Sequence, residues 1–212
     1  MIKYGDKNIR SDAFQLAQRL FSDTSSPKTC SAFGVGWGGS YIEAAELILR
    51  DYHDTTYIGF DSFQGLPKET PGVWYPDRHS EGCFSMSKNI TLEKLANLGI
   101  KEDDPRFLIV DGWFKDTLTF NMAESITNLI YVNIDVDIHS SSIELLDFIK
   151  PFLRKNVILY WDDWKDPIDK FDGKWGEHLA WEEWSTKNPE LVVETVGVNN
   201  YNQRIMKIIS VD

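Results

Sequence analysis

Short apolar segments recur along the chain, and longer segments with helical periodicity separate most of them. The first five of seven such segments are nearly continuous in apolar residues, as in strands buried on both faces of a parallel sheet. The pattern predicts strands at CSAFGV (30–35), TTYIGF (55–60), RFLIV (106–110), LIYVNI (129–134), NVILYW (156–161), LVVETV (191–196) and RIMKIISV (204–211).

The segments between these strands predict helices at 41–52, 91–100, 142–153 and 176–187. Two of these helices open with the pattern of a capping box, in which a serine and a glutamate three residues later satisfy the first backbone N–H groups. The boxes would be Ser40 with Glu43 and Ser141 with Glu144. Alternation of strand and helix predicts an α/β fold with a parallel sheet.

The end of the chain departs from this alternation, because only residues 197–203 separate the last two predicted strands. A connection this short, with two asparagines and a glycine, cannot cross over a sheet and predicts an antiparallel hairpin. The predicted fold is therefore an α/β, mostly parallel sheet that ends in a C-terminal antiparallel hairpin.

The longest irregular segment spans residues 65–90 and contains Pro67, Pro71 and Pro76 together with several glycines. A loop of this length inside a compact domain is usually functional. We expect it to act as a lid over a ligand site.

Four glycines, at 34, 36, 38 and 39, lie between the first strand and the first helix in AFGVGWGGSY. Such a turn lets the backbone approach a ligand at the carboxyl ends of the strands. Asp61 ends the second strand, 61 − 38 = 23 residues after Gly38, where an acid can accept hydrogen bonds from ribose hydroxyls. The two features predict an adenosine-containing cofactor but do not separate a dinucleotide from S-adenosylmethionine. The plainer alternative is a tight turn and a solvated aspartate.

Two adjacent acids follow the fifth strand in YWDDW, although carboxylates repel each other and lose solvation between aromatic rings. Asp135 ends the fourth strand, and Asp162 and Asp163 end the fifth, so adjacent parallel strands would bring all three to one place. A divalent cation such as Mg²⁺ prefers carboxylate oxygens and would make this arrangement favourable. The alternative is that one aspartate caps a helix and the other is solvated.

Composition narrows the class of protein. The 212 residues suit a single domain, 1–212, and the formal charge of 22 − 33 = −11 with no basic stripe argues against nucleic-acid binding. No apolar run reaches transmembrane length, and the N-terminus lacks a signal-peptide core. With two isolated cysteines, Cys30 and Cys83, we expect a cytoplasmic protein. The sequence does not decide between a monomer and a homo-oligomer.

Four motifs, in order along the chain, resemble those of the macrocin O-methyltransferase family of S-adenosylmethionine-dependent enzymes. They are FDSFQGLP (60–67), GWFKDTL (112–118), IDVDIHSSSIELL (134–146) and YWDDW (160–164). The resemblance extends from about residue 30 to the C-terminus and implies a Rossmann-like methyltransferase fold. It also implies that Asp135, Asp162 and Asp163 hold a magnesium ion, and that a hydroxyl of a sugar or another small natural product accepts the methyl group.

The same resemblance implies how a cofactor would bind. The glycine turn, with Val35, Trp37 and Gly38, would surround the methionine end, chiefly through Gly34, Gly36 and Ser40. Asp61 and Ser62 would hold the ribose, and Gly112, Trp113 and Phe114 would lie near the adenine. One departure is Ala32, where such families usually carry an acid, which implies either a replacement by water or weaker anchoring of the cofactor's amino group.

A proton acceptor is also needed, and two residues near the proposed metal are candidates. Histidine is the residue type that most often accepts a proton in catalysis, so His139 is one candidate, and Asp137 is the other. Asp135 would act in catalysis through the metal. Among the tryptophans, we expect Trp181 and Trp184 to be core residues, and Trp74 and Trp164 to form part of a substrate wall.

Two other functions share some of these features. An NAD-dependent oxidoreductase would use the glycine turn and Asp61 but has no need of the acids in YWDDW. A non-catalytic module that binds adenosine compounds would be favoured if Ala32 reports lost catalysis.

Overall fold

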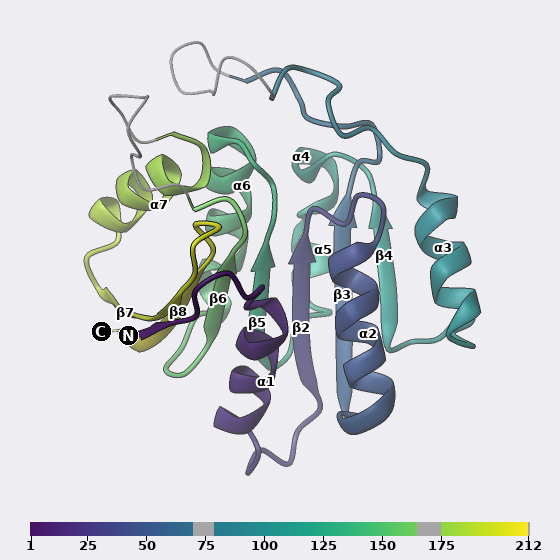
Figure 1. Ribbon diagram of the computed structural model, residues 1–212, viewed down its shortest axis with the longest axis horizontal. Helices are drawn as coiled ribbons and strands as arrows, with labels where there is room; N and C mark the ends of the chain where they lie inside the picture. Colours follow the sequence, from purple (N-terminus) through teal and green to yellow (C-terminus); the bar gives the residue numbers. More distant parts are fainter. Residues whose placement is uncertain (70–78, 165–174, 212) are drawn as a thin grey trace.

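The computed structural model describes residues 1–69, 79–164 and 175–211. Its centre is an eight-stranded sheet with the order β1-β7-β8-β6-β5-β2-β3-β4 (Figure 1). The strands are β1 (Ile2–Lys3), β2 (Lys28–Phe33), β3 (Thr55–Asp61), β4 (Phe107–Asp111), β5 (Leu129–Ile134), β6 (Ile158–Trp161), β7 (Leu191–Val198) and β8 (Arg204–Val211). The seven predicted strands are confirmed within a few residues, and β1 is an addition that pairs with β7.

The sheet has the predicted pairing. Strands β2 to β6 pair in parallel, whereas β8 pairs antiparallel with both β6 and β7. The C-terminal hairpin is therefore confirmed. Its last strand lies between β6 and β7, so the parallel part of the sheet continues into the antiparallel part without an exposed edge at β6.

The helices are α1 (Arg10–Leu20), α2 (Gly39–Asp51), α3 (Lys88–Asn97), α4 (Phe114–Thr117), α5 (Phe120–Ala123), α6 (His139–Ile149) and α7 (Gly176–Lys187), and a 3₁₀ turn, η1 (Lys150–Phe152), follows α6. The helix predicted at 142–153 therefore ends early, because Pro151 lies in η1 and cannot continue the hydrogen bonding of α6. Helices α1, α4 and α5 had no counterpart among the predicted helices.

Both predicted capping boxes are wrong, because the helices begin earlier than their serines require. Helix α2 begins at Gly39 after a left-handed Gly38, and α6 begins at His139 after Ile138, and neither Gly38 nor Ile138 has a side chain that caps its helix. In the first turn of α6, the Ser140 N–H instead donates to Glu69 Oε2 (2.9 Å). Ser40 and Ser141 consequently lie inside the first turn of their helices, where both face a cavity. Glu43 instead accepts a hydrogen bond from the Ser11 hydroxyl on α1.

Helices cover both faces of the sheet, as alternating residues of the strands require (Figure 1). On one face, Phe14 of α1 packs edge-on against Tyr131 of β5, with ring centroids 5.4 Å apart. On the other face, Phe148 of α6 contacts Phe60 of β3, with centroids 6.0 Å apart. The central strands are buried between these layers, as their continuous apolar sequences predicted.

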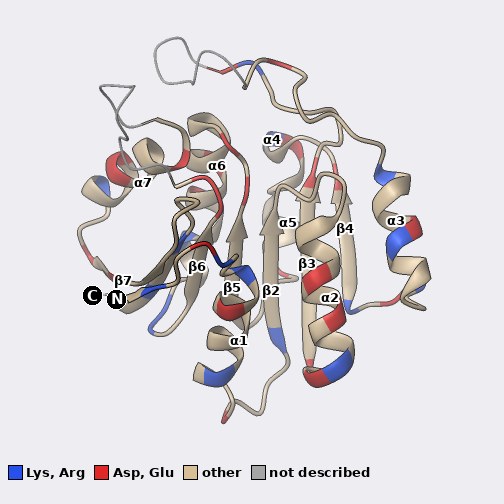
Figure 2. Cartoon of the chain, in the orientation of Figure 1, with Lys and Arg blue, Asp and Glu red and all other residues tan. Residues whose placement is uncertain are grey.

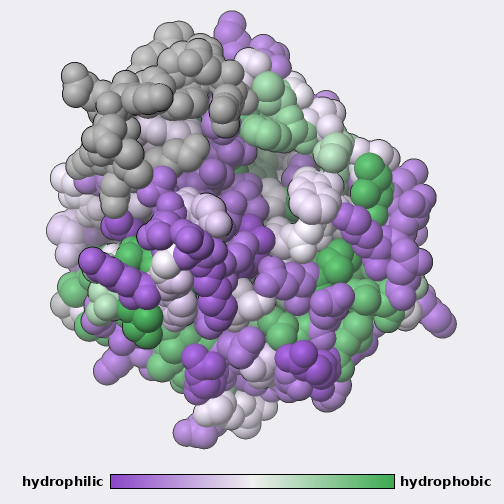
Figure 3. Space-filling model, viewed as in Figure 1, coloured by the Kyte–Doolittle hydropathy of each residue, from purple (hydrophilic) through white to green (hydrophobic). Residues whose placement is uncertain are grey.

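The carboxyl ends of the parallel strands meet at one edge of the sheet, where Figure 2 shows acidic residues gathered in the connecting loops. The face drawn in Figure 3 is mostly hydrophilic, with separate small apolar patches. Within the described residues, no helix is both long enough and apolar enough to cross a bilayer.

Candidate active site

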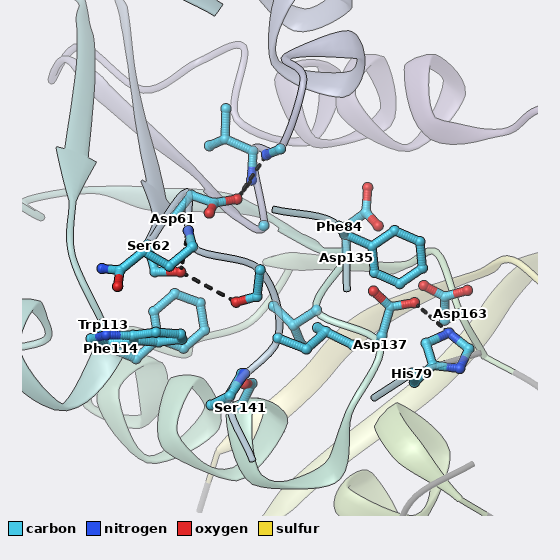
Figure 4. Close-up of a pocket in the computed structure, with 18 of the residues that line it drawn as sticks. Asp61, Ser62, His79, Phe84, Trp113, Phe114, Asp135, Asp137, Ser141 and Asp163 are labelled. Atoms are coloured by element: carbon cyan, nitrogen blue, oxygen red, sulfur yellow. Dashed lines mark hydrogen bonds and ion pairs between the residues drawn. The ribbon is translucent and has the colours of Figure 1, made fainter. Parts of the chain in front are cut away.

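A cavity of about 1180 Å³ opens at the carboxyl edge of the sheet. Ligand pockets typically have about 300–1,000 Å³, so this volume can hold two small molecules side by side. Figure 4 shows two ends to the cavity. Asp61, Ser62, Trp113 and Phe114 lie at one end, and the other end contains His79 with a group of aspartates.

The first end is built by the glycine turn, which wraps around the carboxylate of Asp61. Asp61 Oδ2 accepts hydrogen bonds from the backbone N–H groups of Val35 (2.8 Å) and Gly36 (2.7 Å). Its Oδ1 accepts one from the N–H of Phe63 (2.6 Å). An ionised carboxylate has about four acceptor sites, so these three bonds leave capacity for a ligand hydroxyl.

Gly34 is required for this turn to approach the neighbouring strand end. A Cβ atom at Gly34 would lie 1.7 Å from the backbone oxygen of Asp135, and the residue has φ +82°. A side chain there would push β2 and β5 apart at the point where both line the cavity. The close contact between Gly34 and the Asp135 backbone therefore connects the glycine turn at one end of the cavity with the aspartates at the other.

The motif DSFQGLP forms the rim of the cavity together with the second described part of the long loop. The Leu66 N–H donates to the Cys83 carbonyl (2.8 Å), and the Gly82 N–H donates to the Leu66 carbonyl (2.9 Å). A Cβ atom at Gly65 would lie 2.4 Å from the Cys83 oxygen, which explains the glycine in this motif. The backbone thus fastens residues 79–86 over the site.

Nearly all residues that were predicted to hold a cofactor line the cavity. These are Gly34, Val35, Gly36, Trp37, Ser40, Asp61, Ser62, Gly112, Trp113 and Phe114. Gly38 does not: a Cβ atom there would meet Thr91 of α3 at 2.8 Å, so this glycine serves packing between the turn and α3. Trp37 is exposed, and the Lys94 ammonium lies 4.2 Å from its ring centre.

At the second end, Asp135, Asp162 and Asp163 each offer an oxygen atom within 4.8 Å of the other two. The pairing of β5 with β6 places Ile134 opposite Trp161, and so the residues that follow these strands lie side by side. Neighbouring parallel strands bring the three carboxylates together, as predicted. Three oxygens at this spacing fit the ligand preference of a divalent cation such as Mg²⁺.

Glu177, the second residue of α7, holds the loops that carry these aspartates. It is fully buried, and its Oε1 accepts hydrogen bonds from the N–H groups of Val136 (2.9 Å) and Asp137 (3.3 Å). Its Oε2 accepts one from the Asp163 N–H (3.2 Å). One carboxylate therefore fixes both strand ends, and Gly176 beside it allows the close contact, because a Cβ atom there would lie 2.3 Å from the Asp137 oxygen.

The electrostatics of this end favour added positive charge. Burial, followed by the negative charge of Asp162, raises the pKa of Asp135, and burial, followed by Asp137 and Glu177, raises the pKa of Asp163. Burial also raises the pKa of Glu177. Carboxyls in this state either bind protons or recruit a cation.

Two basic side chains meet these acids, and neither was predicted from the sequence. Arg10 Nη2 lies 2.7 Å from Asp162 Oδ1 and 3.3 Å from Asp135 Oδ2. His79 Nε2 lies 3.0 Å from Asp137 Oδ1, and its side chain is only 5% exposed (Figure 4). Asp137 has φ +62°, an uncommon conformation that turns its side chain toward the histidine.

Comparison with known protein families decides between the functions that remained open. A sequence profile of the macrocin O-methyltransferase (TylF) family matches residues 10–166, which is most of the chain. The chain belongs to this family. Its members are S-adenosylmethionine-dependent O-methyltransferases, so the oxidoreductase and the non-catalytic binding module are no longer favoured.

Solved structures of O-methyltransferases share the fold. The O-methyltransferase NovP is 19% identical, with a TM-score of 0.74 over 95% of this chain and 79% of its own. The calicheamicin methyltransferase CalS11 is 19% identical, with a TM-score of 0.69 over 93% and 78%. An O-methyltransferase from Bacillus cereus, in complex with S-adenosylhomocysteine (SAH), is 13% identical, with a TM-score of 0.56 over 94% and 81%. No curated protein sequence matches the chain significantly.

Within this O-methyltransferase family fold, Ala32 lies buried in β2 opposite Gly59 and Asn133. The Asn133 amide is fully buried and has no hydrogen-bond partner among the described residues. An acid at position 32 would place a carboxylate beside this amide, and the alanine supplies no such partner. The effect of Ala32 on cofactor anchoring stays a prediction.

Two residues that the sequence associated with the methyltransferase reaction lie elsewhere. His139 does not line the cavity: its Nε2 lies 2.9 Å from Glu183 Oε2, at the contact between α6 and α7. Trp164 is 3% exposed and packs on Trp161 and on the guanidinium of Arg204, so its prediction as a substrate wall is wrong. Trp181 and Trp184 are buried as predicted, and Trp74 lies outside the described residues.

Four residues of the site were missed. Arg10 precedes every motif, His79 lies in an irregular loop, and Glu177 looks like an ordinary acid at a helix start. Phe84 is 58% exposed with φ +63° and lines the cavity beside His79, with ring centroids 5.7 Å apart. For His79 and Phe84 a signal existed, because both lie in the segment 65–90 that was predicted to cover a ligand.

Proposed function

We propose that the chain methylates a hydroxyl group of a sugar or small natural product, with a divalent cation at Asp135, Asp162 and Asp163. Family membership supports the methyl transfer. One structural neighbour, CalS11, supports the acceptor class, because it is a calicheamicin methyltransferase described as a TDP-rhamnose 3'-O-methyltransferase. The observation that carries the metal is the convergence of three carboxylate oxygens within 4.8 Å at the cavity end opposite Trp113.

The end of the cavity with Asp61 would bind S-adenosylmethionine, which supplies a methyl group on a sulfonium leaving group. The Asp61 carboxylate, already oriented by the N–H groups of Val35 and Gly36, would accept hydrogen bonds from the ribose. Trp113 and Phe114 would contact the adenine through their rings. The residues of the glycine turn that line the cavity, Gly34 and Gly36 among them, would hold the methionine end of the cofactor.

The second end fits a divalent cation, which when bound would lower the pKa of an acceptor hydroxyl. Asp135 and Asp163 would hold it with carboxylates whose burial makes a cation favourable. Glu177 would keep the two loops in register through its bonds to three backbone N–H groups. The chain's own task is thus to fix the geometry of the acids around one point.

We assign the proton acceptor to the pair of Asp137 and His79, in place of His139. The His79 imidazole holds Asp137 Oδ1 at 3.0 Å, and both residues line the cavity. The proton of the substrate hydroxyl would move to the second carboxylate oxygen of Asp137, and His79 would fix the orientation of that carboxylate. His139 would take no part, because its ring faces Glu183.

The experiment that tests this function is transfer of a labelled methyl group from S-adenosylmethionine across a panel of deoxysugar nucleotides and glycosylated natural products. We expect transfer to at least one hydroxyl acceptor with Mg²⁺ and loss of transfer in EDTA. Full methyl transfer in EDTA would reject the proposed metal requirement but would still support the methyltransferase activity. Transfer only to amine or carbon acceptors would reject the acceptor class.

A further inference from the structure

Arg10 occupies the acidic end of the cavity, although it belongs to the first turn of α1 and lies 125 and 152 residues from the two aspartates that it contacts. Its side chain is 15% exposed. Asp162 Oδ1 receives three donors: Arg10 Nη2 (2.7 Å), the Tyr160 hydroxyl (2.5 Å) and Gln203 Nε2 (2.8 Å). The same Nη2 atom of Arg10 also reaches Asp135 Oδ2 at 3.3 Å.

The guanidinium has a second acidic neighbour on its other side. Arg10 Nη1 lies 3.8 Å from Glu43 Oε2 on α2, and the guanidinium carbon lies 5.4 Å from the ring centre of Tyr160. Glu43 also accepts a hydrogen bond from the Ser11 hydroxyl. Arg10 therefore lies between two acidic groups: the cavity aspartates and Glu43.

We propose that Arg10 is the resident counter-ion of the acidic centre, and that a divalent cation must displace it from Asp135 and Asp162. This inference rests on the proposed function, because it takes the same aspartates as the metal ligands. A guanidinium and a divalent cation that contact the same two carboxylates lie close together, and their like charges repel each other more strongly the less the site is solvated. Arg10 thus stabilises the metal-free protein and weakens its affinity for the metal.

Glu43 is the receiving group in this exchange. When the guanidinium leaves the aspartates, a change in side-chain torsion brings it closer to Glu43, which already lies 3.8 Å from Nη1. The ion pair that is lost at the metal centre is replaced by one between α1 and α2. Glu43 therefore favours metal binding only while Arg10 is present. A direct long-range attraction between the Glu43 carboxylate and the cation would not depend on Arg10.

The test is a titration of chelator-stripped protein with Mn²⁺, followed by electron paramagnetic resonance of the free ion. Arg10→Gln keeps an amide donor without the charge, and it should bind Mn²⁺ at least about tenfold more tightly than the parent. Glu43→Gln should bind Mn²⁺ more weakly than the parent. In the double variant the Glu43 change should have little further effect, as coupled neighbours require.

Three controls make the outcome specific. Arg19→Gln removes the same charge from the exposed last turn of α1 and should leave Mn²⁺ affinity unchanged. Asp162→Asn should abolish binding, which locates the ion. Arg10→Lys retains the charge and should bind Mn²⁺ with an affinity close to that of the parent. If metal-free Arg10→Gln folds poorly, the melting temperature provides a second readout. Mn²⁺ should then raise the melting temperature of Arg10→Gln more than that of the parent.

Equal or weaker Mn²⁺ binding by Arg10→Gln would overturn the inference and would show that Arg10 supports the metal ligands. If Glu43→Gln lowers the Mn²⁺ affinity equally in the parent and in the Arg10→Gln background, the proposed role of Glu43 would be overturned. If neither the parent nor Arg10→Gln binds Mn²⁺, the proposed metal site itself fails, which is a different result from a site that binds Mn²⁺ independently of Arg10.

Discussion

The imidazole of His79 lies 3.0 Å from the carboxylate of Asp137, and both side chains line the cavity beside the clustered aspartates. A second histidine–acid pair, His139 with Glu183 at 2.9 Å, lies outside that cavity. The two pairs have similar geometry but different surroundings. They therefore provide a matched comparison for the role of the first pair.

His79→Gln should lower the rate of methyl transfer, because the Asp137 carboxylate would lose the imidazole that orients it. We expect a decrease in kcat of about 10²-fold, the lower range for loss of acid–base assistance. His139→Gln should stay within a few-fold of the parent, and neither change should alter the affinity for SAH. Equal losses from both variants in a methyl-transfer assay would contradict the assignment of the proton acceptor to Asp137 and His79.

Asp61→Ala should remove most of the rise in melting temperature that SAH produces. The carboxylate holds the glycine turn through Val35 and Gly36 and would also bind the ribose, and hydrogen bonds to a charged group contribute about 1.5–3 kcal/mol each. Asp111→Ala is the control, because Asp111 lies opposite Asp61 in the sheet register but does not line the cavity. An unchanged SAH shift in Asp61→Ala would exclude Asp61 from the cofactor site.

Asp163→Asn should stabilise the metal-free protein near neutral pH. Because the pKa of Asp163 is raised above its ordinary value of 3.8, the folded protein keeps a proton that the unfolded chain has lost. The free energy of unfolding therefore falls as pH rises from about 4 through the raised pKa, and the asparagine removes this loss. Denaturation in chelator over a pH series should show a gain for the variant that shrinks toward acid pH.

Substitution of Asp104 should have the opposite effect on the free energy of unfolding over the same pH series. Its hydrogen bond with Arg106 lowers the pKa of Asp104, so its contribution to stability is present above the unfolded pKa and is lost as pH falls through the lowered one. Asp104→Asn should consequently destabilise the protein near neutral pH. For Asp163→Asn, a gain in the free energy of unfolding that does not change with pH would show that the gain does not come from removing a buried charge.

Trp164→Ala should destabilise the protein by about 3–5 kcal/mol, as expected for a large aromatic residue removed from a core. Trp37→Ala should change stability little, because this ring is exposed, but it should weaken binding of SAH. Chemical denaturation and a thermal shift with SAH would measure both effects. A stable Trp164→Ala variant with a defect only in acceptor binding would restore the substrate-wall interpretation.

The sequence predicted the parts of this molecule that depend on local pattern. Continuous apolar runs located β2 to β6, and the short connection at 197–203 located the hairpin, because strand length and turn length leave few alternatives. The aspartates could be grouped because Asp135 and Asp162 follow neighbouring strands. These inferences need only the direction and order of the strands.

The missed residues depend on contacts between distant segments. Arg10 reaches Asp162 across 152 residues, and Glu177 holds Asp163 and Val136 from the start of α7. His139 is close to Asp135 along the chain, whereas the start of α6 turns its ring toward α7. No periodicity or motif encodes such directions, which are set by how helices pack on the sheet.

The most direct test of the account is a crystal structure of the protein with SAH and Mn²⁺, with the ion located by its anomalous signal. We expect one Mn²⁺ at Asp135, Asp162 and Asp163, with the Arg10 guanidinium moved toward Glu43. We also expect the SAH ribose on Asp61 and the adenine beside Trp113, within the same cavity. An ion bound away from these aspartates, or SAH bound outside the cavity, would contradict the proposed function.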